Sequence, residues 1–140
     1  MKYVVLVSHG NFAEGLLDAL SMLAGKRDDV IAIGLKNGMS ADQFKDAFKQ
    51  AIAVIPDDAK IIVLADIIGG SPLTTAMNTL ASLNRLDQTM ALGGMNLALA
   101  LTTVLMKDAL DDAALVSNVT GEATGAIRPF VLETSEEDEI

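Results

Sequence analysis

The sequence contains a single histidine, and it directly follows a short apolar run. Val4 to Val7 lead into Ser8-His9-Gly10, and a stretch with helical spacing comes next. A second polar group, Asp66 followed by Gly69-Gly70-Ser71-Pro72, comes after the apolar run 61–65. Ligand sites in open α/β sheets lie beyond the carboxyl ends of the strands. If the two runs are neighbouring parallel strands, His9 and Asp66 therefore meet at one rim.

These residue types suit phosphoryl transfer through a phosphohistidine. A carboxylate on the donor nitrogen of a neutral imidazole fixes its tautomer, so Asp66 would orient His9 as a nucleophile. Gly69 and Gly70 remove side chains, which lets backbone N–H groups approach an anion closely. Ser71 and the following proline open a helix whose free N–H groups favour negative charge. We expect Gly69, Gly70 and Ser71 to hold phosphoryl oxygens.

Three further residues could complete the rim of this site: Ser8, Gly10 and Asn96. Ser8 and Gly10 flank the histidine, and Asn96 follows Gly93-Gly94 after the fourth apolar run. The residues also fit plainer roles. A lone histidine is often a surface or satisfied core residue, Asp66 could cap a turn, and Gly70-Ser71 could be ordinary helix-start chemistry. The residues alone leave both interpretations open.

Other chemistries fit the sequence less well. A Ser71–His9–Asp66 hydrolase triad has the right residue types, but the Gly-x-Ser-x-Gly elbow is missing. A receiver-type phospho-aspartate module needs an acidic pair where Ser8-His9 stand. A dinucleotide fold needs Gly-x-Gly-x-x-Gly after the first strand. One histidine and no cysteine make a transition-metal site unexpected, so no metal and no cofactor is predicted.

The elements that must position these residues alternate in periodicity. Short runs rich in valine and isoleucine are typical of buried parallel strands, and four occur, over residues 3–7, 30–35, 61–65 and 89–92. Helical stretches lie between them and after Asn96; one begins at Ser40 with Gln43 as a capping-box pair, and another at Asn11 with Glu14. This order predicts an α/β fold with three layers, α/β/α, and a mainly parallel, doubly wound sheet.

The last extended stretch covers residues 126–132. Pro129 cannot donate to a sheet ladder, so this stretch is expected at a sheet edge. We expect one domain over residues 1–132 and an acidic, solvated tail over 133–140. The net charge is −9 and the sequence shows no basic patch, so no nucleic-acid partner is expected. Residues 95–106 are too short to cross a bilayer and no export signal is visible, so a cytoplasmic location is expected.

On these motifs the sequence resembles the IIA domains of the mannose/fructose/sorbose family of the bacterial sugar phosphotransferase system. Ser8-His9-Gly10 with Ala13-Glu14-Gly15-Leu16 looks like the family's phosphorylation site. Asp66 with Gly69-Gly70-Ser71-Pro72 is similar to its second signature, and Gly94-Met95-Asn96-Leu97 to its third. The family usually has proline where this chain has Ala98.

The resemblance implies a carrier that accepts phosphate from phospho-HPr on His9, through Nε2, and passes it to a histidine of a IIB component. Sugar would be phosphorylated during uptake through membrane IIC and IID components, and these motifs do not name the sugar. The resemblance also implies a homodimer that exchanges the last strand between subunits as an antiparallel sheet edge. The alternative is a regulatory IIA-like module that uses phosphorylation of His9 as a signal.

Overall fold

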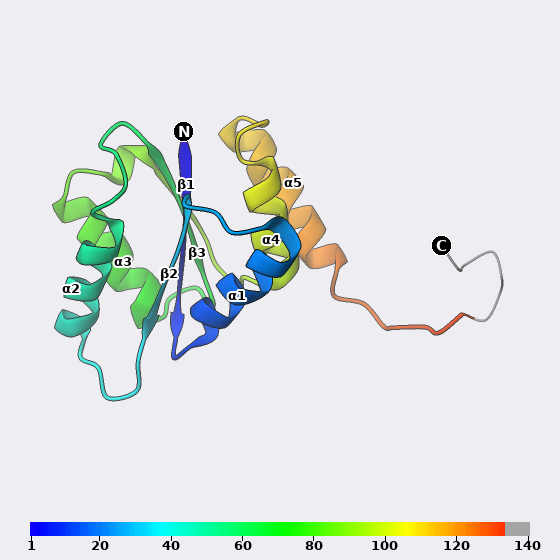
Figure 1. Ribbon diagram of the computed structural model, residues 1–140, viewed down its shortest axis with the longest axis horizontal. Coiled ribbons are helices and arrows are strands. Elements are labelled where there is room, and N and C mark those ends of the chain that lie inside the picture. Colours follow the sequence, from blue (N-terminus) through cyan, green and yellow to red (C-terminus); the bar gives the residue numbers. More distant parts are fainter. Residues whose placement is uncertain (134–140) are drawn as a thin grey trace.

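Each apolar run predicted as a strand forms one in the computed structural model, which describes residues 1–133 of the chain. The strands are β1 (Lys2–His9), β2 (Val30–Leu35), β3 (Lys60–Ala65) and β4 (Thr89–Leu92). They lie side by side in the order β2-β1-β3-β4, and every pairing in this sheet is parallel. The first and third strands are therefore neighbours, and their carboxyl ends lie at the same edge (Figure 1).

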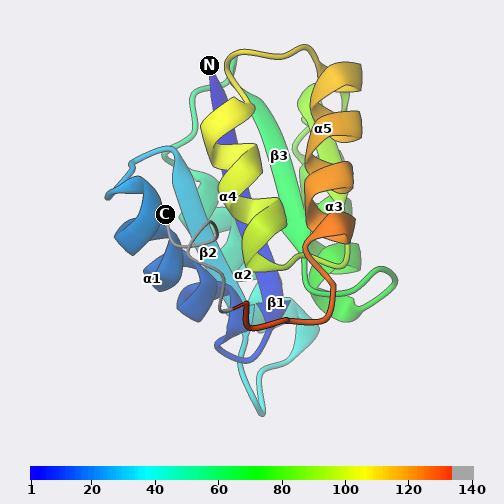
Figure 2. The same ribbon diagram turned by 90° about the vertical axis from the view of Figure 1, so that its right-hand side faces the viewer.

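Helices cover both faces of this sheet, which confirms the predicted three-layer α/β/α fold. On one face lie α1 (Phe12–Ala24), α4 (Leu97–Met106) and α5 (Asp112–Gly125), and on the other lie α2 (Ala41–Ile52) and α3 (Ser71–Ser82) (Figure 1). A short 3-10 helix, Leu86–Gln88, precedes β4. Figure 2 shows α4 and α5 side by side in front of the strands.

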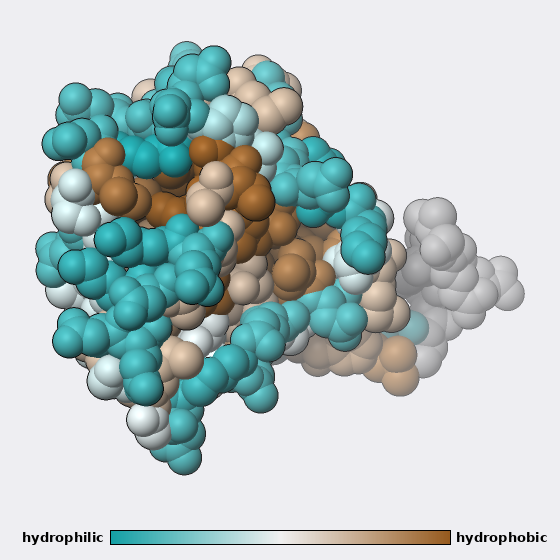
Figure 3. All heavy atoms as spheres, turned by 60° about the vertical axis from the view of Figure 1, so that its left-hand side comes forward, coloured by the Kyte–Doolittle hydropathy of each residue, from teal (hydrophilic) through white to brown (hydrophobic). Residues whose placement is uncertain are grey.

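The alternation of side chains along β1 divides the core into two clusters. Val4 and Leu6 pack with α1, α4 and α5, whereas Val5 and Val7 pack with α2 and α3. All four side chains are fully buried, as expected for a central strand with covered faces. The edge strand β2 is less covered, and Figure 3 shows apolar atoms in a hollow between polar groups on the side of the molecule where α2 lies.

The helix starts confirm one sequence prediction and correct another. At α2, Ser40 Oγ accepts from the N–H of Gln43 and the Gln43 side chain accepts from the N–H of Ser40, which is the predicted capping box. At α1, Asn11 occupies the N-cap position, but its side chain caps nothing. Ser8 Oγ accepts from the N–H of Ala13 instead, at 2.7 Å. The predicted N-cap position at Asn11 is confirmed, but the expected capping hydrogen bond comes from Ser8 at the end of β1.

The C-terminal stretch does not form the predicted edge strand in this single chain. Helix α5 continues to Gly125, and no strand occurs over residues 126–133. Figure 1 shows this stretch leaving α5 and running away from the sheet. Its apolar side chains are largely exposed, Phe130 at 88% and Leu132 at 78%. A strand needs a partner for its backbone groups, and none lies beside this stretch within residues 1–133. Most of the predicted acidic tail, residues 134–140, lies outside the described part.

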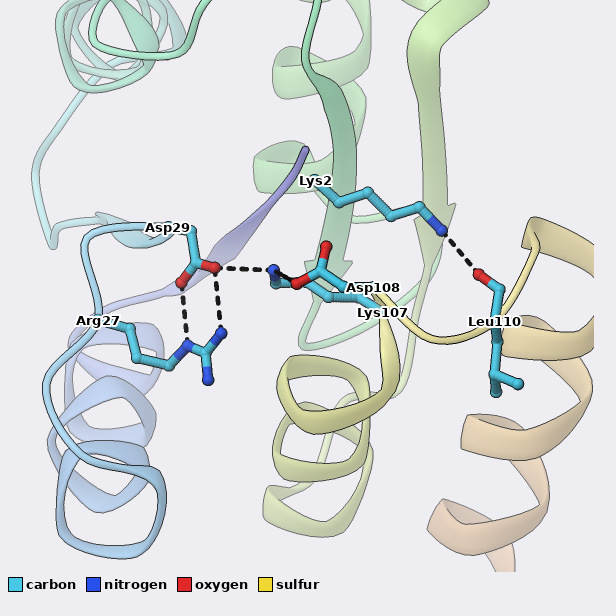
Figure 4. A network of polar contacts seen from close by, with 6 residues as sticks. All are labelled: Lys2, Arg27, Asp29, Lys107, Asp108 and Leu110. Atoms are coloured by element: carbon cyan, nitrogen blue, oxygen red, sulfur yellow. Dashed lines mark hydrogen bonds and ion pairs between the residues drawn. The ribbon is translucent and has the colours of Figure 1, made fainter.

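Charged side chains tie the amino-terminal edge of the sheet to the end of α4. Lys107, only 1% exposed, contacts Asp29 at 2.7 Å and Asp108 at 2.8 Å, and Arg27 donates two hydrogen bonds to Asp29 (Figure 4). Burial raises the pKa of Asp29, but hydrogen bonds from Arg27 and Lys107 outweigh it and lower that pKa to about 2. Within residues 1–133, no helix is long and apolar enough to cross a membrane.

Candidate functional site

The pairing of β1 with β3 brings His9 and Asp66 together, as expected from the sequence. Val7 of β1 lies opposite Ala65 of β3, and the N–H of Asp66 donates to the carbonyl of Val7 at 3.2 Å. Asp66 is one residue past Ala65 and His9 is two residues past Val7, and there the two side chains meet: His9 Nδ1 lies 2.8 Å from Asp66 Oδ2. The contact therefore follows directly from the strand order.

The Asp66 carboxylate is held by three nitrogen atoms. Its Oδ2 accepts from the backbone N–H of His9 at 2.9 Å and faces the ring Nδ1, and its Oδ1 accepts from the N–H of Ile67 at 2.9 Å. Partial burial raises the pKa of Asp66, but these hydrogen bonds outweigh it and lower the pKa below the usual 3.8. The group is an anion at neutral pH. It can therefore only accept at Nδ1, which places the proton of a neutral ring there.

The other ring nitrogen of His9 is available for chemistry. The His9 side chain is 50% exposed, and its Nε2 makes no hydrogen bond to any residue in the described part of the chain. The ring lies against the start of α3, because a Cβ added at Gly70 would stand 3.0 Å from His9 Cε1. Glycine at this position lets the ring reach the helix start without a clash. In a neutral ring with its proton on Nδ1, Nε2 carries the lone pair, and the ring lies beside a helix N-terminus.

The start of α3 has the features of an anion cradle. Gly70 is the N-cap residue, and Ser71 is followed by Pro72 within the first turn. Gly69, just before the cap, has φ +80°, a conformation that side chains rarely adopt. Ser71 is exposed, and its hydroxyl has no hydrogen-bond partner among residues 1–133. Free N–H groups, the helix dipole and this unpartnered hydroxyl all belong to the start of α3, whose N-cap Gly70 lies against the His9 ring.

The three predicted rim residues lie near helix starts, with their polar groups engaged in the fold. Ser8 is fully buried and caps α1 through Oγ, while the N–H of Gly10 donates to the carbonyl of Leu35 at 2.8 Å. The Asn96 side chain accepts from the N–H of Leu99 at 2.8 Å and donates to the carbonyl of Ala123 at 3.1 Å. Asn96 thus joins the start of α4 to the end of α5.

Two kinds of residue at this edge were missed from the sequence. Ile67 and Ile68, in the loop that follows Asp66, are 52% and 78% exposed, and Phe12 at the start of α1 is 50% exposed. Two isoleucines in a loop between a strand and a Gly-Gly turn were a visible signal, since loops usually carry polar residues. Lys36, which follows β2 and contacts the start of α1, carried no such signal.

Neither the pocket on the α1 side nor a metal-ligand cluster involves His9 within residues 1–133. A pocket of about 700 Å³ is lined by residues of α1, the following loop, Val30 and Val104, and His9 is not among them. Within residues 1–133, no group of three or more histidine, aspartate or glutamate side chains is placed to hold a metal ion. The half-exposed His9 ring and the Ile67 side chain both lie against Gly70.

Comparisons with known proteins show which family the chain resembles. The family model EIIA-man, described as PTS system fructose IIA component, matches residues 3–120. The fructose-specific EIIA component of Bacillus subtilis (strain 168) is 27% identical over 119 residues, which cover 85% of this chain and 80% of the relative.

Solved structures show the same fold. The PTS IIA protein associated with the fucose utilization operon of Streptococcus pneumoniae is 28% identical and superposes with a TM-score of 0.77 over 91% of this chain and 92% of its own. The mannose/sorbose-specific IIA subunit of Enterococcus faecalis gives a TM-score of 0.79 over 96% and 99% of the two chains; at 23% identity, this likeness concerns the fold.

Proposed function

Since the chain belongs to the EIIA-man family of sugar phosphotransferase system IIA components, we propose that it is a phosphohistidine carrier with His9 as the phosphorylated residue. The observation that carries this proposal is the contact of His9 Nδ1 with Asp66 Oδ2 at 2.8 Å, which leaves Nε2 without a hydrogen-bond partner within residues 1–133, in a half-exposed ring beside the start of α3. A nucleophile in front of an anion cradle is the arrangement that phosphoryl transfer requires.

The proposed reaction has two steps. The Nε2 lone pair attacks the phosphorus of phospho-HPr, the N–P bond to the donor histidine breaks, and that bond's electron pair returns to the donor nitrogen. The new N–P bond on His9 leaves Nδ1 protonated and bonded to Asp66, so the carboxylate balances the positive charge that develops on the ring. The second step repeats this exchange toward a histidine of a IIB component. Donor and acceptor are chemically alike, so positioning and electrostatics are the protein's main contribution.

Each candidate residue has a physical role in this proposal. Gly69 and Gly70 let the backbone approach the phosphoryl oxygens, and the Ser71 hydroxyl can donate to one of them. Ser8, Gly10 and Asn96 do not contact the phosphoryl group in this proposal. They fix the turns and helix starts around the site. The exposed side chains of Phe12, Ile67 and Ile68 offer apolar contact area to HPr and to IIB in turn. No cofactor or metal enters the reaction.

We also propose a cytoplasmic homodimer. Residues 126–132 carry exposed apolar side chains, and β4 lies at one edge of the sheet. Antiparallel pairing of this stretch with β4 of a second copy would satisfy both sets of backbone groups. Sugar uptake would then proceed through membrane IIC and IID components, which receive phosphate by way of IIB.

A phosphoryl relay tests the function directly. The chain is incubated with Enzyme I, HPr and labelled phosphoenolpyruvate, and then chased with the candidate IIB. Acid-labile label that is lost in His9→Ala and moves to IIB supports the carrier. Label that forms on His9 but does not leave favours the regulatory module, and absence of label contradicts both.

A further inference from the structure

Lys36 links the end of β2 to the first turn of α1, next to His9. Its ammonium group donates to Asn11 Oδ1 at 2.5 Å and forms an ion pair with the carboxylate of Glu14. Asn11 is the N-cap residue of α1 and Glu14 lies in its first turn. One cation thus holds two side chains of this turn, which explains why Asn11 does not cap the helix itself.

The backbone around Lys36 is shaped for this contact. A Cβ added at Gly34 would overlap the carbonyl oxygen of Gly10 and would lie 3.4 Å from the Lys36 ammonium. The Gly10 carbonyl and the Lys36 ammonium therefore both lie next to Gly34, where a side chain at position 34 would clash with them. The absence of a side chain at position 34 brings the end of β2 and the turn after His9 into close contact.

Three separate contacts fix the turn between β1 and α1. Ser8 Oγ accepts from the N–H of Ala13 at 2.7 Å, the N–H of Gly10 donates to the carbonyl of Leu35 at 2.8 Å, and Lys36 holds Asn11 with Glu14. The first two contacts hold backbone N–H groups, and the third is the only one of the three that joins side chain to side chain. His9 is the residue between Ser8 and Gly10, so its direction depends on this turn.

We propose that Lys36 is a positioning residue for phosphoryl transfer at His9: it clamps the first turn of α1 onto β2 and so sets the direction of Nε2. This inference rests on the proposed carrier function. The ion pair with Glu14 cancels the lysine charge locally, so Lys36 acts through geometry and not by attracting the phosphoryl group.

The test compares rates of phosphoryl transfer from phospho-HPr to variants of the chain. Lys36→Met is expected to slow acceptance about fivefold, the change that corresponds to about 1 kcal/mol of lost positioning at a partly exposed pair. Lys36→Arg keeps the charge and the donors and is expected to restore most of the rate. Lys49→Met, at an exposed lysine of α2 that forms no ion pair within residues 1–133, is the matched control and is expected to leave the rate unchanged.

Glu14→Gln separates positioning from charge. If Lys36 acts through the clamp, Glu14→Gln also slows transfer, and the double variant is no slower than Lys36→Met alone. If Lys36 acts by attraction, Glu14→Gln exposes its charge and accelerates transfer, which would overturn the inference. A Lys36→Met protein that matches the wild-type rate would overturn it as well.

A readout that needs no phosphoryl donor keeps this test independent of the proposed function. Amide hydrogen exchange at Gly10 and Ala13, and the chemical shifts of the His9 ring nitrogens, report the turn and the ring directly. Lys36→Met is expected to speed exchange at both amides about fivefold and to shift the ring resonances, and Lys49→Met to change neither. Unchanged exchange and ring shifts in Lys36→Met would contradict the clamp. Failure of wild-type chain to accept phosphate would instead contradict the carrier function.

Discussion

The Nδ1 atom of His9 lies 2.8 Å from Oδ2 of Asp66, and the same oxygen accepts from the backbone N–H of His9 at 2.9 Å. One carboxylate oxygen therefore holds both the ring and the peptide of the same residue. This double contact fixes where the ring sits as well as which nitrogen carries the proton. Substitution of Asp66 therefore keeps the His9 ring in the chain but removes the group that orients it.

Asp66→Asn is expected to slow phosphoryl acceptance by at least about tenfold while the fold remains native. An amide can turn its NH₂ toward Nδ1, which would move the ring proton to Nε2 and remove the nucleophilic lone pair. The measurement is the single-turnover rate from phospho-HPr, with the ring tautomer read from nitrogen chemical shifts. A wild-type rate in the variant would reduce Asp66 to a turn residue.

Ser71→Ala is expected to slow transfer about threefold to tenfold, because one neutral hydrogen bond to a phosphoryl oxygen is lost. Ser117→Ala, at an exposed serine of α5, is the control and is expected to leave the rate unchanged. Thermal unfolding of both variants should match the wild type, since the Ser71 hydroxyl has no partner within residues 1–133. Equal rates in Ser71→Ala and wild type would remove this hydroxyl from the phosphoryl site.

Ile68→Asn is expected to weaken productive encounter with phospho-HPr and with IIB, because it removes an apolar side chain that is 78% exposed beside the site. The apparent KM for both proteins should rise about fivefold, with kcat nearly unchanged. Met22→Asn, at an 82% exposed residue near the end of α1, is the matched control. Equal KM values for the two variants would indicate that partners dock elsewhere.

Asp29→Asn is expected to lower the free energy of unfolding by ~2 kcal/mol at neutral pH, because it leaves the buried Lys107 ammonium without its closest carboxylate. The pKa of Asp29 in the folded chain is about 2, below its usual 3.8, so this stabilisation is present above about pH 4 and is lost as the pH falls toward 2. Urea unfolding across this range checks the sign. Asp28→Asn is the neighbouring control, and a constant difference between pH 2 and pH 7 would contradict the assignment.

The sequence patterns predict the sheet and the central contact well, for a clear physical reason. Residues 30–35 and 89–92 form strands with the predicted bounds. Short apolar runs rich in valine and isoleucine between helices are typical of strands in a parallel sheet that is covered on both faces. His9 and Asp66 meet because both end strands that are neighbours in the sheet. The capping box joins Ser40 to Gln43, only three residues away, so the sequence alone is enough to predict it.

What the sequence could not predict depends on contacts between distant residues. The Asn11 side chain could have capped α1, but Lys36, just after β2, donates a hydrogen bond to it. Ser8 accepts from the helix N–H in its place. Asn96 was expected at the rim, and it also bridges to Ala123 at the end of α5. Residues 126–132 have the composition of a strand. A strand forms only where a neighbouring strand pairs with its backbone N–H and C=O groups, and in the single chain the apolar side chains of this stretch stay exposed.

The most direct test of the phosphocarrier is the position of the phosphoryl group after incubation with phospho-HPr. Nuclear magnetic resonance of the nitrogen-labelled, phosphorylated chain identifies both the residue and the ring nitrogen. The proposal predicts one acid-labile group, bonded to Nε2 of His9, with Nδ1 still protonated toward Asp66. A group on Nδ1, on Ser71 or on any residue other than His9 would contradict it, as would a chain that accepts no phosphate.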